Sequence, residues 1–113
     1  MVKSGYIPGR GDFIWVNLDP GLGHEQLGRR PALVVSPGSY SAKTGMVVIC
    51  PLTKQIKGYV FEVLIQIQRI SGAILVDQVR AVDFRARRAK FIARADGLIV
   101  QEVLDKLSVL LGL

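Results

Sequence analysis

The sequence predicts a mainly β (α+β) fold, in which a small, strongly curved sheet or partly open β-barrel carries a C-terminal amphipathic helix. Short β-like runs follow one another from residue 13 to residue 93, separated by Gly, Pro, Asp and Ser. From Leu98 onward the apolar residues change to the spacing of a helix. The 113 residues are enough for one core, so we expect a single domain over residues 1–113.

The individual elements follow from local patterns. Strands are expected over the runs 13–18, 32–36, 45–52, 61–67, 73–82 and 87–93. Residues 39–44 are typical of a turn, residues 61–67 alternate as a half-exposed strand should, and residues 73–82 hold an irregularity near Asp77 and Gln78. Asp96 is the expected helix cap and Gly112 the expected stop. The apolar stripe of this helix comprises Val100, Val103, Leu104, Leu107, Leu110 and Leu111.

Composition restricts the possible chemistry. Fifteen Lys and Arg against nine Asp and Glu give a net charge of +6, which favours an anionic partner. A single Cys and a single His exclude a disulfide framework within the chain and a Cys/His zinc site, so we expect no metal and no cofactor. No apolar run approaches the ~18 residues of a membrane span, and residues 1–12 lack the apolar core of a secretory signal. We therefore expect a soluble, cytoplasmic protein without a membrane partner.

One loop, residues 19–30, lacks apolar periodicity and has a length that is usually functional or disordered. Glu25 lies on it, and Arg30 ends it just before Pro31, which favours an extended backbone at Arg30. Thr53 follows the end of another expected strand. If these strand ends meet, a base, a cation and a hydroxyl converge. The alternative without a catalytic role is a salt bridge within the loop between Glu25 and one Arg, with Thr53 in a turn.

Such a trio suits cleavage of RNA by its own 2′-hydroxyl, a reaction that needs no metal. Glu25 would take the 2′-hydroxyl proton, Arg30 would clamp the phosphate, and Thr53 would orient it. Attack of this kind predicts 2′,3′-cyclic phosphate and 5′-hydroxyl ends. The imidazole of His24 is either a general acid for the leaving oxygen or a surface side chain.

Positive charge concentrates in residues 80–94, where six cations face a single Asp83. Nucleic-acid contact explains this asymmetry better than a solvated strand face does. Lys54, Lys57 and Tyr59 lie near Thr53 and offer phosphate contacts and a stacking platform. Two roles are equally open for Trp15: a second surface on which bases stack, or a side chain that packs in an interface. Cys50 lies in an apolar run, which favours a small buried hydrophobe over a nucleophile.

Several short motifs follow one another along the chain. They are Gly11-Asp12-x-Ile14-Trp15-Val16, Gly23-x-Glu25-Gln26-x-Gly28-x-Arg30-Pro31-Ala32, residues 34–37, Lys43-Thr44-Gly45-Met46, Lys57-Gly58-Tyr59 with Phe61-Glu62-Val63, Asp77-Gln78-Val79 and Arg85-Ala86-Arg87. With these motifs the sequence resembles the MazF/PemK-type mRNA interferase toxins of bacterial type II toxin–antitoxin pairs. It departs from that family's pattern at His24, Arg29, Lys54 and Val60, which surround the expected substrate path.

The resemblance implies an SH3-like barrel, a homodimer, and metal-independent, sequence-selective cleavage of single-stranded mRNA. It also implies that translation and growth are inhibited, that a cognate acidic antitoxin neutralises the toxin, and that DNA is reached only through the antitoxin complex. The family's catalytic residues fall on Glu25, Arg30 and Thr53. The expected RNA-binding residues are His24, Arg29, Lys54, Lys57, Tyr59, Gln78, Arg80, Arg85, Arg87 and Arg88.

Two other classes of function remain open from the sequence. One is a non-catalytic toxin of the same barrel class that poisons a topoisomerase by binding it. The other is a plain RNA-binding SH3-like module. A base beside a phosphate clamp favours the enzyme over both, because a binding module has no use for that base.

Overall fold

Antiparallel strands form the body of the fold in a computed structural model that describes residues 5–19, 23–25 and 28–113. The strands are β1 (Asp12–Asn17), β2 (Arg29–Val34), β3 (Met46–Thr53), β4 (Glu62–Ile67), β5 (Ile70–Leu75), β6 (Arg80–Asp83) and β7 (Lys90–Arg94). The helices are α1 (Gly38–Thr44), the 3₁₀ turn η1 (Val76–Gln78) and α2 (Gly97–Leu111). The sheet order is β4-β5-β3-β2-β1-β7, with β6 paired to β3 off this path.

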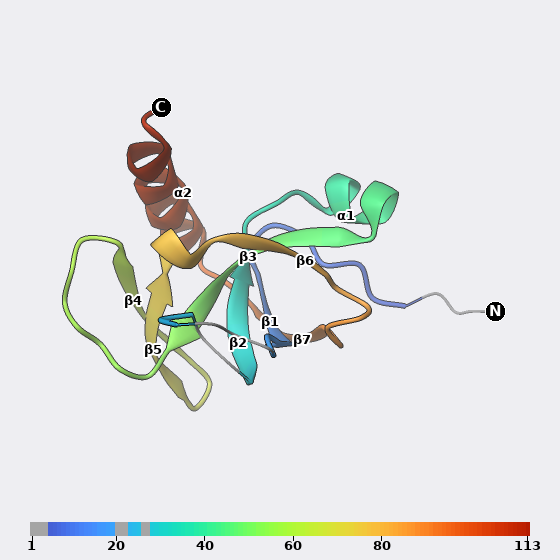
Figure 1. Ribbon diagram of the computed structural model, residues 1–113, viewed down its shortest axis with the longest axis horizontal. Coiled ribbons are helices and arrows are strands. Elements are labelled where there is room, and N and C mark those ends of the chain that lie inside the picture. Colours follow the sequence, from blue (N-terminus) through green and yellow to red (C-terminus); the bar gives the residue numbers. More distant parts are fainter. Residues whose placement is uncertain (1–4, 20–22, 26–27) are drawn as a thin grey trace.

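Strand β3 is the hub of the curled sheet (Figure 1). Its first half pairs with β6, its middle pairs with β2, and its last residues, Leu52 and Thr53, pair with β5. Because its neighbours change along its length, β3 belongs to both halves of the sheet. The mainly β fold with a partly open barrel and a C-terminal helix, predicted from the sequence, is confirmed by this architecture and by its match to a solved relative described below.

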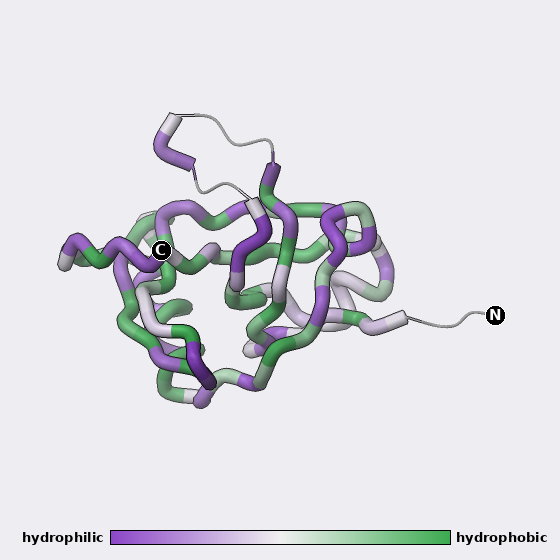
Figure 2. The backbone as a smooth tube through the Cα atoms, turned by 90° about the horizontal axis from the view of Figure 1, so that it is seen from below, coloured by the Kyte–Doolittle hydropathy of each residue, from purple (hydrophilic) through white to green (hydrophobic). Residues whose placement is uncertain are grey.

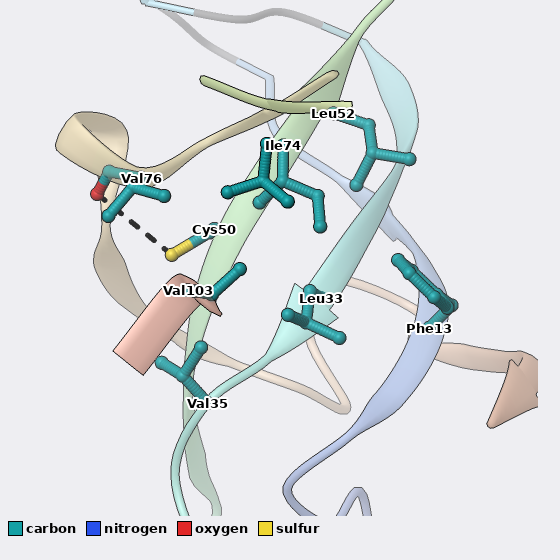
Figure 3. Packing of buried hydrophobic residues seen from close by; sticks show 9 residues of the cluster. Phe13, Leu33, Val35, Cys50, Leu52, Ile74, Val76 and Val103 are labelled. Carbon is teal, nitrogen blue, oxygen red and sulfur yellow. Dashed lines mark hydrogen bonds between the residues drawn. The ribbon is translucent and has the colours of Figure 1, made fainter. Parts of the chain in front are cut away.

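Two hydrophobic clusters lie on opposite faces of the central strands. On β1, Phe13 belongs to one cluster, whereas Ile14 and Val16 belong to the other. Successive side chains of a strand point to opposite faces, so this strand is buried on both sides. Figure 3 shows the first cluster, in which Val103 of α2 packs beside Cys50 and Val35. Long hydrophobic stretches of the strands alternate with hydrophilic turns along the chain (Figure 2).

Helix α2 begins and ends where the sequence predicts. The Asp96 carboxylate accepts a hydrogen bond from Leu98 N at 2.9 Å, and Gly112 ends the helix with φ 73°. Val103 is fully buried, but Leu110 and Leu111 of the predicted stripe are exposed. The stripe therefore packs against the core as far as Leu107, and its last apolar residues are exposed.

Two expected elements were wrong. Residues 39–44 form part of helix α1, which starts after Pro37 and ends at Gly45 with φ 75°. The Pro and Gly at its ends are turn residues, but they also mark the two ends of a helix this short. The single strand expected over 73–82 is two strands, β5 and β6, separated by η1. In the ranges that the structure describes, neither α-helix has the length and apolar character needed to cross a bilayer.

Candidate functional site

Two adjoining hollows lie beside the end of β3. The first has a volume of about 470 Å³ and the second about 330 Å³, and Asp77 and Gln78 line both. We call the pair the groove. The first hollow is lined by His24, Thr53, Gln55, Lys57, Tyr59, Glu62, Leu75, Asp77 and Gln78. The second is lined by Leu18, Glu25, Pro51, Asp77, Gln78, Val79 and Arg80.

The register of β2 and β3 brings Arg30 toward Thr53. Ala32 lies opposite Pro51, and continuing this register by two residues sets Arg30 opposite Thr53 on the same face. Pro51 and Thr53 are two residues apart and line the two hollows, so this face of β3 is shared by both. The Thr53 hydroxyl is buried and accepts a hydrogen bond from Gln55 N at 3.1 Å. The ladder itself ends at Ala32 and Pro51, and Arg30 is not among the residues that line either hollow, so the meeting of Arg30 with Thr53 stays a prediction.

The loop that carries Glu25 is held at both ends. At its base Leu18 N donates to Gly28 O and Gly28 N donates to the Asp19 carboxylate, each at 2.8 Å. The Gln78 amide donates to His24 O at 3.2 Å, which ties the loop to the groove. His24 and Glu25 are exposed and line different hollows of the groove. The loop's Pro20, Gly21, Leu22, Gln26 and Leu27 lie outside the described residues.

Tyr59 and Asp77 form a polar pair across the first hollow. The Tyr59 hydroxyl donates to Asp77 Oδ1 at 2.7 Å. Burial, followed by this hydrogen bond, raises the pKa of Tyr59 to about 12. The phenol is therefore protonated at neutral pH. Tyr59 is also one of the residues that line the first hollow.

The residue of β5 that lies against the Thr53 backbone is a glycine, Gly72. Gly72 of β5 is buried, and a Cβ at this position would lie 3.1 Å from the Thr53 carbonyl carbon and closer still to the carbonyl oxygen. Carbon atoms in contact normally lie about 3.5–4.0 Å apart. Glycine at residue 72 is thus what permits β5 to approach β3 at Thr53.

The basic residues of the 80–94 segment are dispersed rather than gathered. Arg80 lines the groove. The Arg87 guanidinium instead donates to the carbonyls of Asn17 and Asp19, which secures the base of the 19–30 loop. Arg94 forms a 2.7 Å ion pair with the buried Asp12. Of the six cations, Arg80 is therefore the one that lines the groove in the described part of the chain.

Four further predicted RNA-binding residues lie outside the described lining of the groove. Arg85 stacks over Phe84 at 4.9 Å, and Arg85 and Arg88 line a separate hollow near Tyr6. The Arg29 guanidinium donates to Arg88 O at 3.1 Å, on the outer end of β2. Lys54 is exposed directly after Thr53. These residues are close to the groove in sequence or through the 19–30 loop, but they do not form its walls.

Cys50 is a packed apolar residue, as predicted. It is fully buried in the first cluster, with its thiol 4.0 Å from Val76 O (Figure 3). Burial raises the pKa of the Cys50 thiol to about 12, so the reactive thiolate is scarce at neutral pH. Trp15 is half-buried between Pro31 and Lys90 on the neighbouring strands, and its two interpretations stay open.

Sequence reasoning missed Gln55, Glu62 and Asp77 as members of the groove. Glu62 was expected on a half-exposed strand face with Leu64 and Gln66, but its side chain is buried while Leu64 is exposed. An acidic side chain at the first position of a β-run, after a loop containing Gly58, was the available signal. No set of three His, Cys, Asp or Glu side chains suited to a metal ion occurs in the described ranges.

Comparisons with known proteins agree with this architecture. The endoribonuclease toxin MazF of Escherichia coli (strain K12) is 45% identical over 109 residues, covering 96% of this chain and 98% of that protein. The endoribonuclease PemK of Escherichia coli is 36% identical over 107 residues, covering 90% of this chain and 80% of that protein. The crystal structure of MazF from Deinococcus radiodurans matches with a TM-score of 0.91 at 45% identity, covering 96% of this chain and 100% of that one.

A MazE–MazF complex from Deinococcus radiodurans also matches, with a TM-score of 0.84 at 41% identity over 96% of this chain and 99% of that one. The family described as PemK-like, MazF-like toxins of type II toxin–antitoxin systems matches residues 9–111. On its sequence, its fold and these matches, the chain belongs to this family of toxins.

Proposed function

We propose that this toxin is a metal-independent endoribonuclease that cleaves single-stranded mRNA with sequence selectivity, and that residues 1–113 act as one domain. Relatives that share 45% and 36% of their aligned residues with it are named endoribonucleases. The observation that carries the proposal is the pair of adjoining hollows lined by Glu25 and by Thr53, supported by a β2–β3 register that, continued two residues past Ala32 and Pro51, pairs Arg30 with Thr53. Cleavage of mRNA in this way accounts for inhibition of translation and growth.

Each step of the reaction has a residue suited to it. The Glu25 carboxylate takes the proton of the 2′-hydroxyl, whose oxygen attacks the adjacent phosphorus. The Arg30 guanidinium stabilises the negative charge of the pentavalent phosphorane through paired N–H donors. The Thr53 hydroxyl orients a phosphate oxygen. The P–O5′ bond then breaks, the 5′-oxygen takes up a proton, and the products carry a 2′,3′-cyclic phosphate and a 5′-hydroxyl.

The surrounding polar residues supply binding. His24, Lys57, Tyr59, Gln78 and Arg80 line the groove, which suits an RNA strand with phosphates on the cations and a base on the Tyr59 ring. We assign Arg29, Lys54, Arg85, Arg87 and Arg88 to a wider electrostatic field. Their effect on RNA is then through long-range attraction, which falls with added salt.

The test uses purified protein, a long RNA and excess EDTA. We expect cleavage at defined positions, cyclic phosphate and 5′-hydroxyl ends, and resistance when the scissile nucleotide is 2′-deoxy. A 5′-phosphate product, or loss of cleavage with EDTA, would contradict the mechanism. Intact RNA under all conditions would favour one of the two non-catalytic classes.

Two Arg variants separate chemistry from attraction. Arg30→Ala should lower kcat ~10²-fold or more, because it removes charge stabilisation in the transition state. Arg88→Ala should raise KM and flatten its salt dependence at nearly constant kcat. Arg69→Ala, in the exposed β4–β5 turn, is the matched control and should change neither constant. Equal losses of kcat in the Arg30 and Arg88 variants would refute the assignment.

We further propose that the toxin is a homodimer that an acidic antitoxin neutralises by covering the groove, and that it reaches DNA only through that complex. Leu110 and Leu111 are exposed on α2, and an apolar hollow of about 430 Å³ lies between α1 and α2 beside Leu104 and Leu107. Light scattering that detects only monomer at micromolar concentration would refute the dimer. A toxin–antitoxin complex that binds RNA with full affinity would refute the competition.

A further inference from the structure

The outer wall of the first hollow is the loop between β3 and β4, which extends from the sheet at the left of Figure 1. Residues 54–60 are all exposed, and three of them, Gln55, Lys57 and Tyr59, line the hollow. An exposed segment outside a strand ladder has little apolar burial to offset the conformational entropy lost when it adopts one shape. Its shape must therefore be set by specific hydrogen bonds.

Most of those bonds converge on Glu62, the first residue of β4. Its carboxylate accepts hydrogen bonds from Lys57 N at 3.1 and 3.0 Å, and from Gly58 N at 2.6 Å. Its own backbone N–H donates to Tyr59 O at 3.1 Å. The Glu62 side chain is 7% exposed and lines the hollow from below the loop.

Both oxygens of the Glu62 side chain accept hydrogen bonds from backbone N–H groups. Both N–H groups donate, so the side chain must offer acceptors to each of them. A Gln side chain has the same shape but turns one acceptor into an NH₂ group, which would face a backbone N–H. Gly58 adopts φ 79°, a conformation that other residues take up with strain, so the loop here is drawn into an uncommon shape around the carboxylate.

The far part of the loop is fixed independently. Tyr59 is tied to Asp77, and the Lys106 ammonium of α2 donates to Val60 O at 2.7 Å. Glu62 therefore controls the part of the loop that precedes these two ties, which is where Lys57 projects beside Thr53. Its oxygens are engaged by backbone N–H groups, which suits a structural anchor better than a second general base.

We infer that Glu62 is a positioning residue for RNA recognition, which holds the first part of the 54–60 loop so that Lys57 meets the nucleotides beside the scissile phosphate, next to the Tyr59 ring that Asp77 holds. The inference rests on the function proposed for the groove. Glu62 does not touch the reacting atoms in this scheme. Its loss should weaken and broaden RNA recognition while leaving the chemical step intact.

The experiment compares Glu62→Gln with Glu102→Gln, a matched change on the exposed face of α2. The affinity for an RNA made uncleavable by 2′-deoxy substitution at the scissile nucleotide is measured by fluorescence anisotropy. The value of kcat is measured at saturating RNA, and cleavage positions are mapped on a long RNA. For Glu62→Gln we expect Kd and KM to rise ~10-fold, kcat to stay within about 2-fold, and additional cleavage positions to appear, as befits lost recognition contacts. Glu102→Gln should match the wild type in all three.

A second variant guards against a general folding defect. Gly58→Ala strains the loop backbone at φ 79°, removes no side chain, and would place its Cβ within 4 Å of nothing in the described residues. It should change Kd and the cleavage map in the same direction as Glu62→Gln, with a melting temperature that is lowered by the local strain but stays well above the assay temperature. A loss of kcat at constant KM, or an unchanged Kd and cleavage map in both variants, would overturn the inference. If the wild-type protein itself leaves RNA intact, the proposed function fails instead.

Discussion

Replacing Gly72 by Ala tests how tightly the structure fixes the position of Thr53. The added methyl would lie 3.1 Å from the Thr53 carbonyl carbon, with the carbonyl oxygen closer still. The carbonyl oxygen sets the required shift, and relieving its contact with the methyl requires the two strands to part by about 1 Å or more. A displacement near 1 Å at a reacting group lowers the rate by about 10²-fold. Overpacking of this kind costs about 1–3 kcal/mol in the free energy of unfolding.

The assay is single-turnover cleavage of saturating RNA, performed well below the melting temperature of each variant. We expect Gly72→Ala to lose about 10- to 10²-fold in kcat with KM nearly unchanged, because the methyl moves Thr53 and not the binding walls. Ser71→Ala, at the exposed neighbouring residue, is the control and should retain wild-type kcat. A Gly72→Ala protein that folds and cleaves at the wild-type rate would refute the role given to Thr53's position.

Three other predictions follow from the described contacts. The Cys50 thiol should resist alkylation at pH 7–8 in the folded protein and react only in denaturant, because burial raises its pKa to about 12; rapid reaction of native protein would contradict its burial. The folded-state pKa of Tyr59, about 12, lies above the ordinary 10.0, so its contribution to stability should be complete below pH 10 and lost from pH 10 to 12. Chemical denaturation of wild type and Tyr59→Phe should thus converge over that interval, and a constant difference would argue against the bond to Asp77. Asp96→Ala should lower the free energy of unfolding by about 1 kcal/mol through loss of the helix cap, whereas Glu102→Ala should have little effect in the same urea titration.

Much of the fold was predictable because the alternation of apolar residues reports burial directly. The strand around Phe13 and Ile14 was predicted to within one residue of its observed ends. Its apolar side chains on both faces pack into the two hydrophobic clusters. Helix α1 was missed because a helix of 7 residues makes only about two turns, too few to show an apolar period, and its ends resemble a turn. The division of residues 73–82 into β5 and β6 depends on which strand β3 pairs with at each point, and a single sequence does not reveal that pairing.

The site, too, was predictable from the sequence in part. Arg30 and Thr53 could be placed at strand ends from the positions of Pro31 and Pro51, and they face each other when the β2–β3 register is continued past Ala32 and Pro51. The roles of Gly72 and Glu62 depend on distances between strands and within a loop, which local pattern does not encode. The charged residues of the 80–94 segment are a further example of what the sequence pattern does not encode. Charge density predicts an anionic partner, but the backbone direction at each Arg decides whether it faces a ligand or a carbonyl, as Arg87 does.

The pairing of β3 with three different strands has a consequence for synthesis of the protein. Thr53 is held in place by β5, and the same edge of β3 is completed by β6, which ends at Asp83, while β2 occupies the other edge. Val103, twenty residues further on, closes the first hydrophobic cluster. The groove is therefore incomplete in a nascent chain until Val103 has left the ribosome. An endoribonuclease toxin with this topology becomes active only after strands β1 to β7 and the first half of α2 have been translated.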